Sequence, residues 1–187
     1  AFLWLAESRH ALGQNDDALS DVRQALRRRP DDAIAAALHG TLLAEQNRHA
    51  DAIDAFEEAL EIAPTSAEAP ETLFKLGTCR QTLGKLDLAE QAFTKAAALA
   101  PKEARYREAQ GWLYLQLGRH EEAVEALERA DHLKGGNVQT LRALGLAAAV
   151  GEELLFRGAM LPSLAAWAGF PLAALATATV FGLLHVP

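Results

Sequence analysis

The chain has 187 residues, of which half are hydrophobic, and a formal net charge of −7 at pH 7. This acidic balance argues against a nucleic-acid partner, because phosphate binding needs clustered lysine and arginine. The single cysteine, Cys79, excludes a disulfide framework and a cysteine-rich zinc site, and we expect it to be a small core residue.

Charge is distributed unevenly along the chain. Residues 1–140 hold 16 lysines plus arginines against 23 acids, which accounts for the whole net charge, whereas residues 158–187 hold none of either. This change of composition predicts two units, a first domain over residues 1–136 and a second segment over residues 137–187, with the boundary near the sequence KGGN at 134–137.

The first unit is built from internal repeats. Four stretches align with one another: 11–30, 44–64, 81–101 and 115–135. Small residues recur in register at spacings of 34, 37 and 34: Ala18, Ala52, Ala89 and Ala123, then Ala25, Ala59, Ala96 and Ala130. The longer spacing reflects three extra residues within 65–71.

Each repeat contains two stretches with an apolar period of 3.6 residues, which predicts two helices. The turns between them are expected at Gly13, Asn47, Gly84 and Gly118. The second helices should end at Pro30, Pro64 and Pro101, because proline cannot continue the helical hydrogen bonding. One helix pair cannot bury its apolar face alone, so we predict an all-α solenoid of stacked antiparallel pairs.

This pattern of Gly, Ala, Phe, Ala and Pro resembles the tetratricopeptide repeat, over about residues 1–136, with a clipped first unit. Residues 137–145 resemble the opening helix of a fifth unit. The resemblance implies a groove, lined by the first helices, that binds peptides or partner proteins; the alternative is a spacer without a ligand. By helical spacing the groove should include Phe74, Thr78, Gln81, Trp112 and Gln116, and these positions offer no basic cluster for a C-terminal carboxylate.

Five of the six histidines lie in the repeats: His10, His39, His49, His120 and His132. None has partners at a spacing typical of metal ligands. His49 and His120 occupy equivalent turns, and we expect both to be exposed.

The second unit is almost entirely apolar. Residues 141–161 form one helical run, and residues 171–187 follow a break at Pro162 and 167–171. The 17 residues of the last stretch are near the lower limit for spanning a bilayer. We therefore predict a membrane-inserted helical hairpin; a buried hairpin that caps the solenoid is the alternative. Lys134 and Arg142 favour a cytoplasmic position for the repeats.

Three charged residues, Glu152, Glu153 and Arg157, precede the stretch without charge. On a solvated helix, Glu153 and Arg157 would be an ordinary ion pair worth a few tenths of a kcal/mol. In a membrane helix, charged groups are costly and usually serve function. Phe181 and His185 share one face of the next helix, and a carboxylate and an imidazole that meet in a water-filled pocket could activate water.

The two motifs, Glu-Glu-x-x-x-Arg and Phe-x-x-x-His, together resemble the CPBP family of intramembrane proteases, which includes the type II CAAX prenyl endopeptidases. The resemblance implies peptide-bond hydrolysis in which Glu152 activates water with help from His185, Arg157 holds Glu153, and Phe181 packs the pocket. Any metal would be bound by Glu152 and His185, and zinc is implied by the resemblance alone. These two residues are fewer than the three or so protein ligands that a catalytic zinc takes.

The chain ends two residues after His185, before a later His and Asn motif of that family, so we expect a fragment at both ends and no protease activity from this chain alone. The alternative is a non-enzymatic repeat scaffold with an apolar anchor or cap. A third possibility is that the two halves were joined in error.

Overall fold

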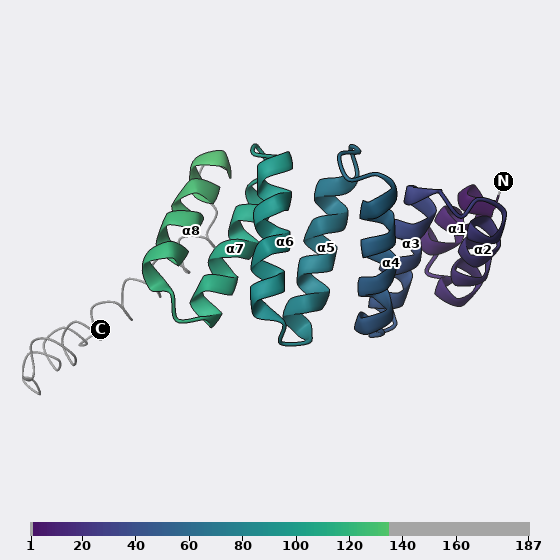
Figure 1. Cartoon of the computed structure of the whole chain (residues 1–187), viewed down its shortest axis with the longest axis horizontal. Helices are drawn as coiled ribbons and strands as arrows, with labels where there is room; N and C mark the ends of the chain where they lie inside the picture. Colours follow the sequence, from purple (N-terminus) through teal and green to yellow (C-terminus); the bar gives the residue numbers. More distant parts are fainter. Residues whose placement is uncertain (1, 135–187) are drawn as a thin grey trace, which may run out of the picture.

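The first unit folds as a stack of helix hairpins. The computed structural model describes residues 2–134, which form eight α-helices in chain order: α1 (Phe2–Ala11), α2 (Asn15–Arg28), α3 (Ala33–Glu45), α4 (His49–Ile62), α5 (Ala69–Thr82), α6 (Leu86–Leu99), α7 (Ala104–Gln116) and α8 (His120–Lys134). Figure 1 shows the pairs following one another along the long axis, with α1 and α2 at one end and α8 at the other. The predicted solenoid of helix pairs is confirmed for this part of the chain.

The turns inside the pairs lie where the repeats predict them. Gly13, Gly84 and Gly118 have φ angles of 74°, 73° and 73°, and Asn47 takes the same place with φ 61°. This left-handed conformation suits glycine, and asparagine tolerates it better than other side chains do. The short turn therefore folds each second helix back along the first.

Proline sets the end of the second helices. α4 ends at Ile62, and Ala63 then adopts an extended conformation with φ −140° and ψ 73° directly before Pro64. Arg29 before Pro30 and Ala100 before Pro101 do the same. The ring of a proline disfavours helical geometry in the residue before it, so the helix stops and the chain turns toward the next pair.

The core runs along the stack between the two helices of each pair. The recurring alanines Ala18, Ala52, Ala89 and Ala123 are fully buried, as their register predicts. Cys79 is also buried, which confirms it as a core residue, and burial raises the pKa of its thiol. A buried thiol with a raised pKa is a poor nucleophile, because the thiolate is the reactive form.

Two of the sequence predictions lie outside the described residues: the opening helix of a fifth unit and the membrane-inserted hairpin within 137–187. Within residues 2–134, no helix has the length and apolar character needed to cross a bilayer.

Candidate functional site

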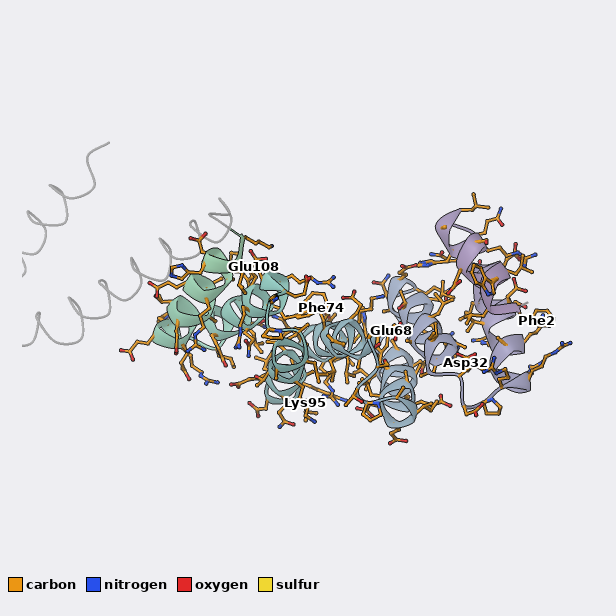
Figure 2. All side chains as sticks on the ribbon, turned by 90° about the horizontal axis from the view of Figure 1, so that it is seen from above. Phe2, Asp32, Glu68, Phe74, Lys95 and Glu108 are labelled. Atoms are coloured by element: carbon orange, nitrogen blue, oxygen red, sulfur yellow. The ribbon has the colours of Figure 1, made fainter. Side chains whose placement is uncertain are left out.

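The first helix of every pair faces the same side of the array. Seen from above in Figure 2, the stack curves, with Phe74 of α5 and Glu108 of α7 along its inner side and Lys95 of α6 along the outer side. The inner, concave surface is therefore lined by α1, α3, α5 and α7, and we call it the concave groove. The outer surface belongs to the second helices.

A pocket of about 430 Å³ opens in the concave groove between α1, α3 and α5. Its apolar part is formed by Ile34 and Leu38 of α3, with Phe56 of α4 behind them. Its charged part is formed by Glu7 of α1, by Glu68 and Glu71 at the start of α5, and by Lys75. The pocket thus combines an apolar wall with a rim in which three carboxylates face one ammonium group.

Polar side chains join neighbouring first helices across the concave groove. His10 of α1 shares a hydrogen bond of 2.8 Å with Glu45 of α3, and Lys75 Nζ donates to Thr41 Oγ1 at 3.1 Å. These contacts link residues 34 or 35 positions apart, which is one repeat. They fix the spacing of the groove walls, although each exposed pair contributes little to stability.

The same type of contact continues between α5 and α7. Arg105 Nη2 lies 2.8 Å from Glu71 Oε2 and 3.0 Å from the hydroxyl of Tyr106. Burial raises the pKa of Tyr106, with Glu71 and Glu103 adding to the effect and Arg105 opposing it. The two cations of this part of the groove, Lys75 and Arg105, both lie against Glu71 and do not form a free basic cluster.

The predicted groove residues divide into three kinds of environment. Gln81 Nε2 donates to Gln116 Oε1 at 2.8 Å, so the structure brings these two predicted residues together across α5 and α7. Thr78 is exposed, and Trp112 keeps 44% of its surface exposed in the same groove. Phe74 is half-buried, with its ring centroid 5.8 Å from Phe93 and 5.6 Å from Tyr106, so it forms part of the groove floor.

Several groove residues were not predicted from the sequence: Glu7, Ile34, Glu68, Glu71, Lys75 and Arg105. The repeat register could have found some of them. Glu7 lies 34 residues before Thr41 and 71 before Thr78, and Ile34 lies 37 before Glu71, so each occupies a groove position of its own unit. This register accounts for Ile34 of the apolar wall and Glu7 of the rim taken singly.

A larger pocket, of about 520 Å³, lies on the outer surface between α4 and α6, where Glu61, Leu73, Lys95 and Leu99 are among its lining residues. A smaller pocket of about 210 Å³ takes the equivalent place one repeat earlier, between α2 and α4. The outer pocket is larger than the one in the concave groove, but the concave side also exposes Thr78 and Trp112 and is the surface on which successive first helices share polar contacts. We therefore take the concave groove as the candidate site.

The histidines of the second helices are less exposed than predicted. His49 and His120 are the first residues of α4 and α8, and both are half-buried with a buried Nδ1 atom that finds no hydrogen-bond partner among residues 2–134. His39 of the first helix α3 is also half-buried, and its Nε2 likewise has no partner among these residues. Burial lowers the pKa of His39 below its ordinary value of 6.5, and the positive charges of Arg23 and Arg48 lower it further.

The second set of predicted site residues lies outside the described residues: Glu152, Glu153, Arg157, Phe181 and His185. In residues 2–134, no group of three or more His, Cys, Asp or Glu side chains is arranged to hold a metal ion.

Two family models match the chain. The tetratricopeptide repeat model matches residues 5–67 and 74–138, which is more than half of the sequence. A model described as type II CAAX prenyl endopeptidase Rce1-like matches residues 135–187. A comparison with curated proteins finds no match.

Solved structures with the same fold are at most distantly related in sequence. MamA 41-end from Desulfovibrio magneticus RS-1 aligns with a TM-score of 0.74 at 18% identity, covering 97% of this chain and 92% of that one. YrrB, described as a TPR protein with an unusual peptide-binding site, aligns at 0.72 and 20% identity, covering 95% and 90%. The first TPR of Spaghetti (RPAP3), bound to the HSP90 peptide SRMEEVD, aligns at 0.59 and 21% identity, covering 63% and 91%. At these identities the likeness establishes the fold.

Proposed function

This chain belongs to the tetratricopeptide repeat family, and we propose that its residues 2–134 bind a peptide segment of a partner protein along the concave groove. The observation that carries the proposal is the pocket of about 430 Å³ on the concave side, together with the exposed Thr78 and Trp112 of the first helices α5 and α7. An exposed tryptophan beside adaptable polar groups is typical of protein interfaces.

The chemistry of the groove fits a peptide backbone. Gln81 and Gln116 form one side chain-to-side chain hydrogen bond with each other, and each amide keeps further donor and acceptor capacity. A peptide lying across α5 and α7 can hydrogen-bond to these amides while an apolar side chain packs on Trp112. The similar structures add support, since YrrB is described as having a peptide-binding site and the first TPR of RPAP3 is bound to a peptide.

The test is selection of binding peptides from a random-sequence display library by the full chain, followed by affinity measurements on Trp112→Ala and Thr78→Arg. Both side chains are exposed, so neither change should disturb the fold, which circular dichroism can check. We expect each change to weaken binding about tenfold or more, as expected for a well-packed interface residue. Lys95→Glu, on the outer pocket, serves as the control. Binding that is insensitive to both groove changes would contradict the proposal.

A second candidate function concerns residues 135–187, and its support is the Rce1-like model that matches them. We propose that this segment is the front part of an intramembrane endopeptidase of that kind, inserted in a membrane with the repeats on the cytoplasmic side. The repeats would then recruit substrates or partners to the membrane.

In that proposal Glu152 takes a proton from a water molecule, and the water oxygen attacks the peptide carbonyl carbon. The C–N bond then breaks as Glu152 returns the proton to the leaving amine nitrogen, and His185 assists the proton transfer. Arg157 holds Glu153, and Phe181 packs the pocket. Glu152 and His185 alone are fewer than the three or so protein ligands of a catalytic zinc, so these residues do not make up a zinc site.

The protease proposal and its alternative, an apolar anchor or cap, make different predictions for the gene that encodes this chain. Glu152→Gln and His185→Ala should abolish its function if the segment belongs to a protease. Both variants should behave as wild type if the segment is only an anchor or a cap. We also predict that this chain alone does not hydrolyse a quenched peptide substrate, and hydrolysis that Glu152→Ala abolishes would contradict that prediction.

A further inference from the structure

The pocket between α1, α3 and α5 has an apolar wall that is open to a ligand. Ile34 keeps 47% of its surface exposed although it is a large aliphatic residue at the start of α3. Leu38, one turn further along the same helix, is half-buried beside it and also lines the pocket. Covering Ile34 and Leu38 with an apolar side chain of a ligand would remove this surface from water, which is favourable in proportion to the apolar area buried.

The rim of the same pocket carries carboxylates that the fold leaves unpaired. Glu7 is exposed on α1 and Glu68 is exposed directly before α5, and neither carboxylate has a hydrogen-bond or ion-pair partner among residues 2–134. Glu71 differs, because it lies 2.8 Å from Arg105 and 4.0 Å from Lys75. The rim therefore offers two free negative charges on opposite sides of an apolar wall.

We propose that this pocket selects a peptide segment in which a lysine or arginine stands next to a large apolar residue. The inference rests on the proposed peptide-binding function and adds the chemistry of the partner. The cationic side chain pairs with Glu7 or Glu68 at the rim, and the neighbouring apolar side chain packs on Ile34 and Leu38. Complementary charge gives such an interface its specificity, because like charges placed together at an interface are disfavoured.

An acidic peptide is the natural contrast. The peptide SRMEEVD, found with the first TPR of RPAP3, carries two glutamates and an aspartate. At the concave pocket of this chain those side chains would face Glu7 and Glu68, while Lys75 and Arg105 are already engaged with Glu71. The pocket should therefore disfavour acidic side chains. Because SRMEEVD also carries an arginine next to a methionine, the matched contrast is a version of a selected peptide in which each basic residue is glutamate.

The test uses the full chain and peptides of defined charge. A random heptapeptide display library should yield sequences enriched in lysine or arginine beside leucine, isoleucine, phenylalanine or methionine. A selected peptide is then compared with a version in which each basic residue is glutamate. We expect the basic version to bind about tenfold tighter than the glutamate version at low salt, with a smaller ratio at high salt because exposed pairs are screened.

Charge reversal in the protein locates the effect. Glu7→Lys and Glu68→Lys should each weaken the binding of the basic peptide. The double variant should bind the glutamate version of the peptide more tightly than the basic version. Glu61→Lys is the matched control, because it makes the same change of charge at another exposed glutamate of the outer pocket, one that has no ion-pair partner within the described part of the chain. Its affinity for the basic peptide should stay within about twofold of wild type, since only screened long-range charge is altered.

The outcomes separate this inference from the proposed function. If no peptide binds, both fail. If peptides bind through Trp112 and Thr78 but the glutamate version binds as well as the basic one, the proposed function stands and this inference is overturned. If Glu61→Lys lowers the affinity for the basic peptide as much as Glu7→Lys and Glu68→Lys do, the concave pocket is not singled out as the site, and the inference is likewise overturned.

Discussion

Gly77 of α5 lies directly against the ring of Phe93 of α6, so that a Cβ atom added at position 77 would come within 2.6 Å of the ring carbon Cε1. Gly40 with Phe56 and Gly111 with Leu127 repeat the relationship in the neighbouring units. The two helices of a pair therefore approach more closely at this point than a larger residue would allow, and the large side chain of the second helix fills the space that glycine leaves.

The first prediction follows from this contact. Gly77→Ala should lower the free energy of unfolding by about 1 kcal/mol, because overpacking against Phe93 costs about 2 kcal/mol and the better helix propensity of alanine returns about 1 kcal/mol. Urea unfolding of the full chain measures the change.

Phe93→Ala provides the control for that prediction, because it removes the ring that the new methyl group meets. In this background, the effect of Gly77→Ala on the free energy of unfolding should change sign. The substitution should then stabilise the protein by up to about 1 kcal/mol, from helix propensity alone. Equal destabilisation in both backgrounds would mean that the contact with Phe93 is not what requires glycine.

The turns give a second prediction, about backbone conformation. Gly84 has φ 73°, and a Cβ atom there would meet nothing within 4 Å, so a substitution tests the backbone alone. Gly84→Ala should destabilise the protein by about 1 kcal/mol or slightly more, the cost of a left-handed conformation for a residue with a Cβ. Gly84→Asn should cost less, because Asn47 already serves in the equivalent turn with φ 61°. Equal stabilities of the two variants, measured by thermal unfolding, would argue against this account.

A third prediction concerns pH. The pKa of His39 is lowered by burial first and then by Arg23 and Arg48, so the folded protein favours neutral His39. Above pH 6.5, His39 is neutral in the folded and the unfolded chain, and its full contribution to stability is present. As the pH falls below 6.5, the unfolded chain binds a proton that the folded chain does not, and stability is lost until His39 of the folded chain is protonated.

His39→Leu tests this, since Leu76 occupies the equivalent position 37 residues later. The variant should lose less stability than wild type between about pH 7.5 and about pH 5.5, and it should be more stable at both because the unpartnered Nε2 is gone. Urea midpoints at the two pH values give the comparison. The same loss of stability in wild type and variant would show that His39 does not contribute to the pH dependence of stability.

A fourth prediction concerns the first helix pair. Asp21 of α2 is 4% exposed, and its Oδ2 lies 2.7 Å from Nη1 of Arg9 on α1. Asp21→Ala should destabilise the protein by about 1–2 kcal/mol, less than for a fully buried pair, because a third of the Arg9 side chain is in water. Asp54→Ala, at an exposed position in the middle of α4 without an ion-pair partner among the described residues, should change stability by less than about 0.5 kcal/mol. Similar losses of stability from Asp21→Ala and Asp54→Ala would show that the Arg9–Asp21 ion pair does not stabilise the fold.

The repeat register predicted the helices and the direction of the groove, because small residues and turn residues recur at 34 or 37 positions and each has a local physical reason. Small residues such as Ala52 and Ala89 are expected in the core where the two helices of a pair pack closely together. Pro64 is expected to end a helix, because proline cannot continue the helical hydrogen bonding. Thr78 and Trp112 are exposed on the concave side, in agreement with helical spacing on a single helix.

Contacts between repeats could not be predicted in the same way. The bond from Lys75 to Thr41 and the pair of Arg105 with Glu71 depend on the rotation from one helix pair to the next, which periodicity within a helix does not determine. The half-buried state of His49 and His120 also depends on how neighbouring helices cover the turn. The acidic rim of the pocket arises from this packing, since Glu7 and Glu68 are 61 residues apart in the sequence.

The most direct test of the account is to locate a bound peptide on the full chain. A selected peptide that carries a photo-crosslinking group at its apolar position should be joined to residues of the concave groove, Ile34, Leu38, Thr78 or Trp112, and mass spectrometry identifies the site. Crosslinks confined to the outer surface, at Glu61, Lys95 or Leu99, would contradict the central claim that the concave groove is the binding site.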